Sequence, residues 1–129
     1  MEHSELTERI IRCAYDVFNT LGAGFLESVY ERSLLIELHH AGLDATPQVQ
    51  LSVYYREECV GQFFADILVN RLVILELKAG ESLSKAHEVQ LVNYLTATGM
   101  PVGLLINFGP EKVEVRRKVR QLDPTSCQS

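Results

Sequence analysis

The sequence lacks any run of about 18 apolar residues, the length that a membrane-spanning helix requires, and its first residues, MEHSELTERI, contain no apolar signal region. We therefore expect a cytoplasmic protein with no part in a membrane. The three cysteines lie far apart and form no CxxC pair, which indicates reduced thiols and argues against a structural zinc site. The sequence also has no glycine-rich phosphate loop, which argues against a small-molecule nucleotide hydrolase.

Positive charge is scarce as well, because 12 Lys and Arg stand against 17 Asp and Glu and leave a net charge of −5. This balance argues against a strong non-specific attraction between the whole protein and nucleic acid. The only cluster of basic residues lies near the C-terminal end and consists of Lys112, Arg116, Arg117, Lys118 and Arg120. It is compatible with phosphate contacts and also with a solvated tail.

Apolar residues are present in ordinary proportion. The chain has 129 residues, of which 47% are hydrophobic and 22% charged, as is typical of a soluble globular protein. This length is enough to bury a hydrophobic core within one domain. We expect that domain over residues 1–121 and a flexible C-terminal tail over residues 122–129.

The spacing of apolar residues predicts the element order ααβββαβ(β). Helical periodicity covers residues 5–20, 25–41 and a segment from Ser82 or Ser84 to about Thr98. Alternating or continuous apolar runs predict strands over residues 48–55, 59–69, 72–78 and 100–108, with a short edge strand at 113–115. The run at 100–108 is apolar at nearly every position, which is typical of a strand buried on both faces. This order indicates an α+β fold with a mixed sheet.

The predicted hairpin over residues 63–78 contains three charges. Asp66, Glu76 and Lys78 interrupt strands that otherwise consist mainly of apolar residues. A charge in such a strand is costly unless it is paired or bound to a metal. Two carboxylates and an amine on one hairpin can hold a divalent cation such as Mg²⁺ or Mn²⁺ and position a water beside it. The alternative is a structural ion pair between Asp66 and Lys78.

The geometry of the hairpin tests whether these charges share a site. A two-residue turn at Asn70-Arg71 would set Asp66 opposite Leu75. Because side chains alternate between the faces of a sheet, Asp66 would then point away from Glu76. A shared site therefore requires a three-residue loop or a bulge. The sequence predicts this irregularity, since Asn70 tolerates the left-handed conformation that such a loop needs.

The same residues carry a resemblance to a known family. Asp66, followed by Glu-Leu-Lys at residues 76–78, resembles the Asp…Glu-x-Lys core of the PD-(D/E)XK nuclease superfamily. Residues 24–30, GFLESVY, resemble the GxxExxY signature of a family of small prokaryotic proteins within that superfamily. The later stretches AHEVQLVNYL and GLLINFG resemble that family too, so the resemblance spans residues 6–115. One departure is the absent "PD" proline, since Ala65 precedes Asp66.

This resemblance implies a restriction-endonuclease-like core, in which helices flank a central mixed β-sheet and the site lies on the hairpin. It implies that Asp66 and Glu76 are catalytic residues that bind Mg²⁺ or Mn²⁺, together with the backbone carbonyl of Leu77. It also implies that Lys78 is the catalytic lysine, which orients or deprotonates the attacking water or stabilises charge on the phosphoryl group.

Three further residues match elements of the superfamily. Glu27 matches an additional acidic residue that binds metal in many members, and Gln90 and Tyr94 match the QxxxY element that lines the site in one branch. Each has an ordinary alternative. Glu27 also suits the first turn of a helix, where a carboxylate favours the helix dipole. Gln90 and Tyr94 are also ordinary residue types for a helix surface.

The sequence thus predicts a metal-dependent nuclease that hydrolyses phosphodiester bonds in DNA, with RNA as a less favoured substrate. The alternative is a non-catalytic binding or regulatory module that keeps the nuclease fold and acts through a protein partner. The small size and the acidic balance of the chain favour that alternative. So short a chain offers little surface to enclose a duplex, which is an argument for a homodimer.

Overall fold

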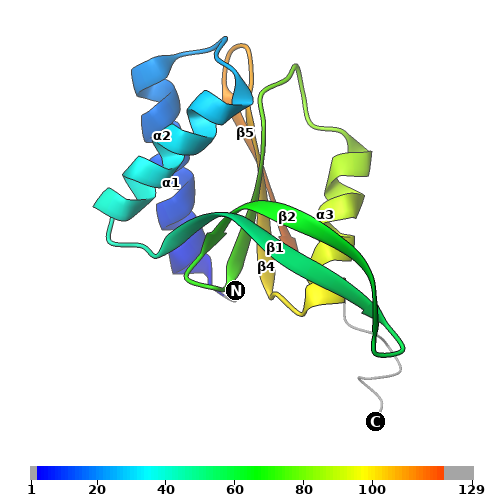
Figure 1. Cartoon of the computed structure of the whole chain (residues 1–129). Coiled ribbons are helices and arrows are strands. Elements are labelled where there is room, and N and C mark those ends of the chain that lie inside the picture. The colour runs from blue at the N-terminus through cyan, green and yellow to red at the C-terminus, as the bar shows by residue number, and fades with distance from the viewer. Residues whose placement is uncertain (1–2, 121–129) are drawn as a thin grey trace.

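The computed structural model describes residues 3–120, and the predicted tail at residues 122–129 lies outside this part of the chain. Figure 1 shows the arrangement of its helices and strands. The elements follow one another as α1 (Ser4–Leu21), α2 (Glu27–His40), β1 (Ala45–Tyr55), β2 (Glu58–Val69), β3 (Val73–Lys78), α3 (Lys85–Thr98), β4 (Val102–Phe108) and β5 (Val113–Val119). The predicted order of elements is confirmed. None of the helices in residues 3–120 is long and apolar enough to cross a membrane.

The five strands form one mixed sheet in the order β1-β2-β3-β4-β5. Strands β3 and β4 are parallel, and α3 connects them, whereas the other neighbouring pairs are antiparallel. Helices α1 and α2 cover one face of the sheet and α3 covers the other (Figure 1). This arrangement confirms the expected α+β fold, in which helices flank a central mixed β-sheet.

Two apolar cores hold these layers together. The larger core lies between the sheet and the first two helices, where α1 buries Ile10, Ala14 and Val17 in one stripe. The smaller core lies under α3, which contributes Leu91 and Leu95. Strand β4 is buried at all seven positions because it lies between these two cores, as its continuous apolar run predicts.

The observed elements differ from the predicted ones mainly at their ends. Helix α2 begins at Glu27, two residues later than predicted, because residues 22–26 form a turn in which Gly22 and Gly24 have φ of 78° and 97°. Strand β1 begins at Ala45 and contains Pro47, where the sequence indicated only a change from helix to sheet. Proline is tolerated there because β1 is an edge strand.

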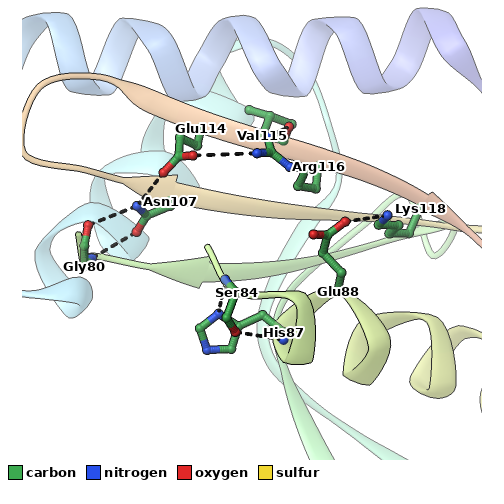
Figure 2. A network of polar contacts seen from close by, with 9 residues as sticks. All are labelled: Gly80, Ser84, His87, Glu88, Asn107, Glu114, Val115, Arg116 and Lys118. Carbon is green, nitrogen blue, oxygen red and sulfur yellow. Dashed lines mark hydrogen bonds and ion pairs between the residues drawn. The ribbon is translucent and has the colours of Figure 1, made fainter. Parts of the chain in front are cut away.

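The basic cluster near the C-terminal end lies largely in a strand. Strand β5 runs to Val119, so the interpretation of Arg116 and Lys118 as part of a solvated tail is wrong. The Nζ atom of Lys118 lies 2.6 Å from Oε1 of Glu88 on α3, and Arg116 lies 3.7 Å from Glu114 (Figure 2). The Lys118–Glu88 pair joins β5 to α3, and both pairs neutralise part of the strand's positive charge.

Candidate active site

The β2–β3 hairpin closes through a three-residue loop, as a shared site requires. Val69 pairs with Val73, and this register leaves residues 70–72 in the loop. Asn70 and Arg71 adopt φ of 51° and 55°, in the left-handed region that asparagine tolerates well. The predicted irregularity is therefore confirmed.

This register brings Asp66 beside the charged end of β3. The last paired residues are Ile67 and Leu75, so one step further along the two strands Asp66 stands opposite Glu76. Backbone pairing between β2 and β3 does not extend beyond Ile67 and Leu75 to these two residues. Oδ2 of Asp66 instead accepts a hydrogen bond of 2.8 Å from the backbone N–H of Leu77. The side chain of Asp66 thus replaces a backbone acceptor and is fixed against β3.

Asp66, Glu76, Glu27 and Glu31 influence one another's charge and are called the carboxylate cluster. Glu76 has the most strongly shifted pKa in this cluster. Burial and the nearby charge of Asp66 raise the pKa of Glu76 to about 8, although Lys78 opposes the shift. Its Oε1 atom is buried and finds no hydrogen-bond partner in the described part of the chain. A buried carboxyl oxygen without a partner destabilises the fold, which makes this atom a candidate ligand for a cation.

Two glutamates of α2 belong to the same electrostatic environment. Burial, followed by the charge of Asp66, raises the pKa of Glu27 and also that of Glu31. Glu27 is a predicted site residue, whereas sequence reasoning missed Glu31. Its spacing of four residues from Glu27 could have revealed it, because residues four apart share one face of a helix. Oε1 of Glu31 also accepts a hydrogen bond of 3.0 Å from the side chain of Gln48.

Tyr30 positions the start of α2, where Glu27 lies. The Tyr30 side chain is fully buried, and its ring stacks on Phe108 with 4.5 Å between the centroids. Its hydroxyl donates a hydrogen bond of 2.6 Å to the carbonyl of Gly22 and accepts one of 3.3 Å from the N–H of Phe25. Tyr30 therefore fixes the turn that precedes Glu27.

A buried asparagine positions the loop that follows Lys78. Asn107 lies beside Lys78 in the register of β3 and β4 and is fully buried. Its Oδ1 accepts a hydrogen bond of 2.9 Å from the N–H of Gly80, and its Nδ2 donates to the carbonyl of Gly80 at 3.0 Å and to Glu114 at 3.4 Å (Figure 2). Sequence reasoning missed this residue, because its partner lies 27 positions away.

The two predicted site residues of α3, Gln90 and Tyr94, lie in different surroundings. The ring of Tyr94 stacks on Phe63 of β2, with 3.6 Å between the centroids and 11° between the planes. This contact attaches α3 to β2 three residues before Asp66. The side chain of Gln90 is exposed. The catalytic roles of Gln90 and Tyr94 stay predictions.

The donor atoms of the cluster suit a hard divalent cation. Within residues 3–120, no group of three or more His, Cys, Asp or Glu side chains lies close enough together to hold a metal ion. The chemistry nevertheless fits, because the cluster offers carboxylate oxygens, includes the unpartnered Oε1 of Glu76, and has raised pKa values that a nearby cation would lower. The full set of ligands, Asp66, Glu76, Glu27 and the Leu77 carbonyl, stays a prediction.

Comparisons with known proteins agree with this fold. The solved structure described as "Crystal structure of SSO0001" is 19% identical to the chain, with a TM-score of 0.59, and the match covers 96% of this chain. It covers 63% of SSO0001, so the chain spans less than two thirds of that protein, and at this identity the likeness shows the fold alone. No curated protein matches the chain. A family model described as PD-(D/E)XK nuclease superfamily matches residues 4–118, and the chain therefore belongs to that superfamily.

Proposed function

We propose that this protein is a divalent-metal-dependent nuclease that hydrolyses phosphodiester bonds in DNA, with RNA as the alternative substrate. One observation carries the proposal. The buried Glu76 carboxyl, with an oxygen that has no partner in residues 3–120, stands opposite Asp66 in the strand register and two residues before Lys78. An excess of carboxylates around one lysine attracts a divalent cation and, through it, a phosphate.

The residues of the cluster divide into those that bind the cation and those that act on the substrate. Asp66, Glu76 and Glu27, with the Leu77 carbonyl, would hold Mg²⁺ or Mn²⁺. A cation bound there polarises a phosphoryl oxygen and lowers the pKa of a water. Lys78 provides an ammonium group that hydrogen-bonds to the attacking water or to the phosphoryl oxygen on which charge develops.

The cluster also explains why the cation and the substrate come together. Without a cation, the carboxylates repel a phosphate backbone, and the net charge of −5 adds to that repulsion. A divalent cation would neutralise most of the negative charge next to Lys78 and offer a positive centre to a phosphate oxygen. Binding of nucleic acid at this end of β3 is therefore expected to depend on the metal.

The test is cleavage of single- and double-stranded DNA and RNA in the presence of Mn²⁺ by the wild type, Lys78→Ala and the control Lys118→Ala. Lys118 is a suitable control because its ammonium group pairs with Glu88, away from the carboxylate cluster. We expect cleavage by the wild type and by the control, and a loss of about 10²- to 10³-fold with Lys78→Ala, as for other groups that stabilise transition-state charge.

Equal cleavage by the wild type and Lys78→Ala would contradict the proposal. No cleavage of any substrate would contradict it too, and would favour a non-catalytic module that acts through a protein partner. The preferred substrate in this assay also decides between DNA and RNA.

A further inference from the structure

A pocket of about 290 Å³ lies at the end of the sheet where β3 and β4 finish. Its lining residues are 24–25, 79–81 and 108–110, which lie before α2, after β3 and at the end of β4. Glu27 follows the first of these segments by two residues, and Lys78 directly precedes the second. Two of the pocket's lining segments therefore adjoin Glu27 and Lys78 in the chain, although neither residue lines the pocket itself. Its volume is close to the lower limit of about 300 Å³ for small-molecule sites and suits a single ring system.

The wall of the pocket contains an aromatic ring that the protein holds in place but leaves partly uncovered. Phe25 is 45% exposed, although it contacts Tyr30 edge-on at 6.1 Å between the centroids. Tyr30 in turn stacks on Phe108, a residue that is only 2% exposed. Because its neighbours are buried and its own N–H is bonded to Tyr30, Phe25 presents an ordered ring surface to a ligand.

The charge of the lining excludes a phosphate and favours a base. Among the described residues that line the pocket, none is basic, and the only charged one is Glu81. A carboxylate repels phosphate but accepts hydrogen bonds from the amino and ring N–H groups of a nucleobase. The N–H and carbonyl of Gly80 are both bonded to Asn107, so this side of the pocket is rigid.

We propose that this pocket binds one unpaired nucleobase of the substrate, next to the phosphodiester that lies at the carboxylate cluster. Phe25 stacks on the base and Glu81 accepts a hydrogen bond from it. The inference rests on the proposed function and narrows its substrate to nucleic acid that presents a base outside a duplex, such as a single strand, a flap or a frayed end. Stacking on an aromatic ring tolerates every base, so this contact gives a preference for structure more than for sequence.

The absence of tryptophan from the chain permits a direct test. Phe25→Trp introduces a single tryptophan into the pocket, and Tyr15→Trp, at a residue of α1 that is 43% exposed, is a control of matched exposure. Each variant is titrated in Ca²⁺ with a short single-stranded DNA and with an abasic strand of the same length. We expect the DNA to quench Phe25→Trp and the abasic strand not to, with Tyr15→Trp unaffected by both.

Two variants without an aromatic ring measure the contribution of stacking. Phe25→Leu keeps apolar bulk and Phe25→Ala removes it. Both are expected to weaken binding of the single strand by about tenfold, within the range for loss of one base–aromatic stack, while Phe25→Trp keeps the affinity. Quenching by the abasic strand, or unchanged affinity in Phe25→Leu and Phe25→Ala, would overturn the inference.

The results separate a failure of this inference from a failure of the proposed function. If cleavage depends on Lys78 but DNA does not quench the fluorescence of Phe25→Trp, the proposed nuclease activity stands and base binding in the pocket is rejected. Base-dependent quenching without Mn²⁺-dependent cleavage of any substrate would keep the pocket as a base-binding site and reject the nuclease.

Discussion

Two glutamates in different regions of this fold have opposite electrostatic environments. Burial and the charge of Asp66 raise the pKa of Glu76 to about 8. A hydrogen bond from Lys118 and the charges of Lys118 and nearby basic residues lower the pKa of Glu88. The contact between Glu88 and Lys118 is 2.6 Å long and joins α3 to β5 (Figure 2).

The difference supports the proposal that a cation binds at the end of β3 and not beside β5. The basic residues of β5 neutralise Glu88 within the fold, so that region is complete without a ligand. At the end of β3, burial and the charge of Asp66 raise the pKa values of Glu76, Glu27 and Glu31, and Lys78 opposes the shift only at Glu76 and Glu27. An imbalance of this kind at the end of a strand, beside a pocket, is typical of a functional site.

The largest effect that follows from this comparison is a dependence of stability on pH. The pKa of Glu76 is about 8 in the folded protein and near 4.5 in the unfolded chain, so the folded state keeps a proton that the unfolded state loses between these values. Without metal, the free energy of unfolding should therefore fall as pH rises from about 5 to about 8, by at most about 1.4 kcal/mol per pH unit. Urea unfolding at several pH values measures this.

Glu76→Gln is the variant that isolates this effect. It removes the titrating carboxyl and keeps its size, so the decline in stability should largely disappear, whereas Glu88→Gln should leave the decline unchanged. A decline of the same slope in Glu76→Gln would show that other groups cause it and would weaken the contrast between the two glutamates.

A smaller effect of opposite sign is expected at Glu88. Its pKa is lowered, so its pairing with Lys118 stabilises the fold above the ordinary pKa of 4.5, and this stabilisation is lost as pH falls through the folded value. Glu88→Gln should shift the acid-unfolding midpoint slightly, and added salt should reduce the shift because ion pairs near the surface are screened. If Glu88→Gln changed the free energy of unfolding more than Glu76→Gln changes it near neutral pH, the order of the two effects would be reversed.

The sequence predicts the parts of the fold that local pattern decides. Strand β4 follows from its continuous apolar run, and the loop after Val69 follows from a parity argument, because only an odd number of loop residues can place Asp66 and Glu76 together. Glu27 was selected from its spacing within a motif, and its role as a metal ligand stays a prediction. In each case, the signal lies within a few residues of the feature that it predicts.

Contacts between distant segments could not be predicted in this way. Tyr30 stacks on Phe108 and Asn107 bonds to Gly80, and no periodicity links either pair in the sequence. The length of β5 was underestimated because its polar residues resemble a solvated tail until Lys118 is seen to pair with α3. The missed residues position the site by packing, which becomes visible only in the folded chain.

The central claim is that the carboxylate cluster at the end of β3 binds a divalent cation, and calorimetric titration with Mn²⁺ tests it most directly. At pH 7, binding to the wild type and to Glu88→Gln should release about one proton, seen as a heat that depends on the buffer, because Glu76 must ionise to become a ligand. Glu76→Gln should bind far more weakly and release none. Equal binding by Glu76→Gln, or no binding by the wild type, would contradict the claim.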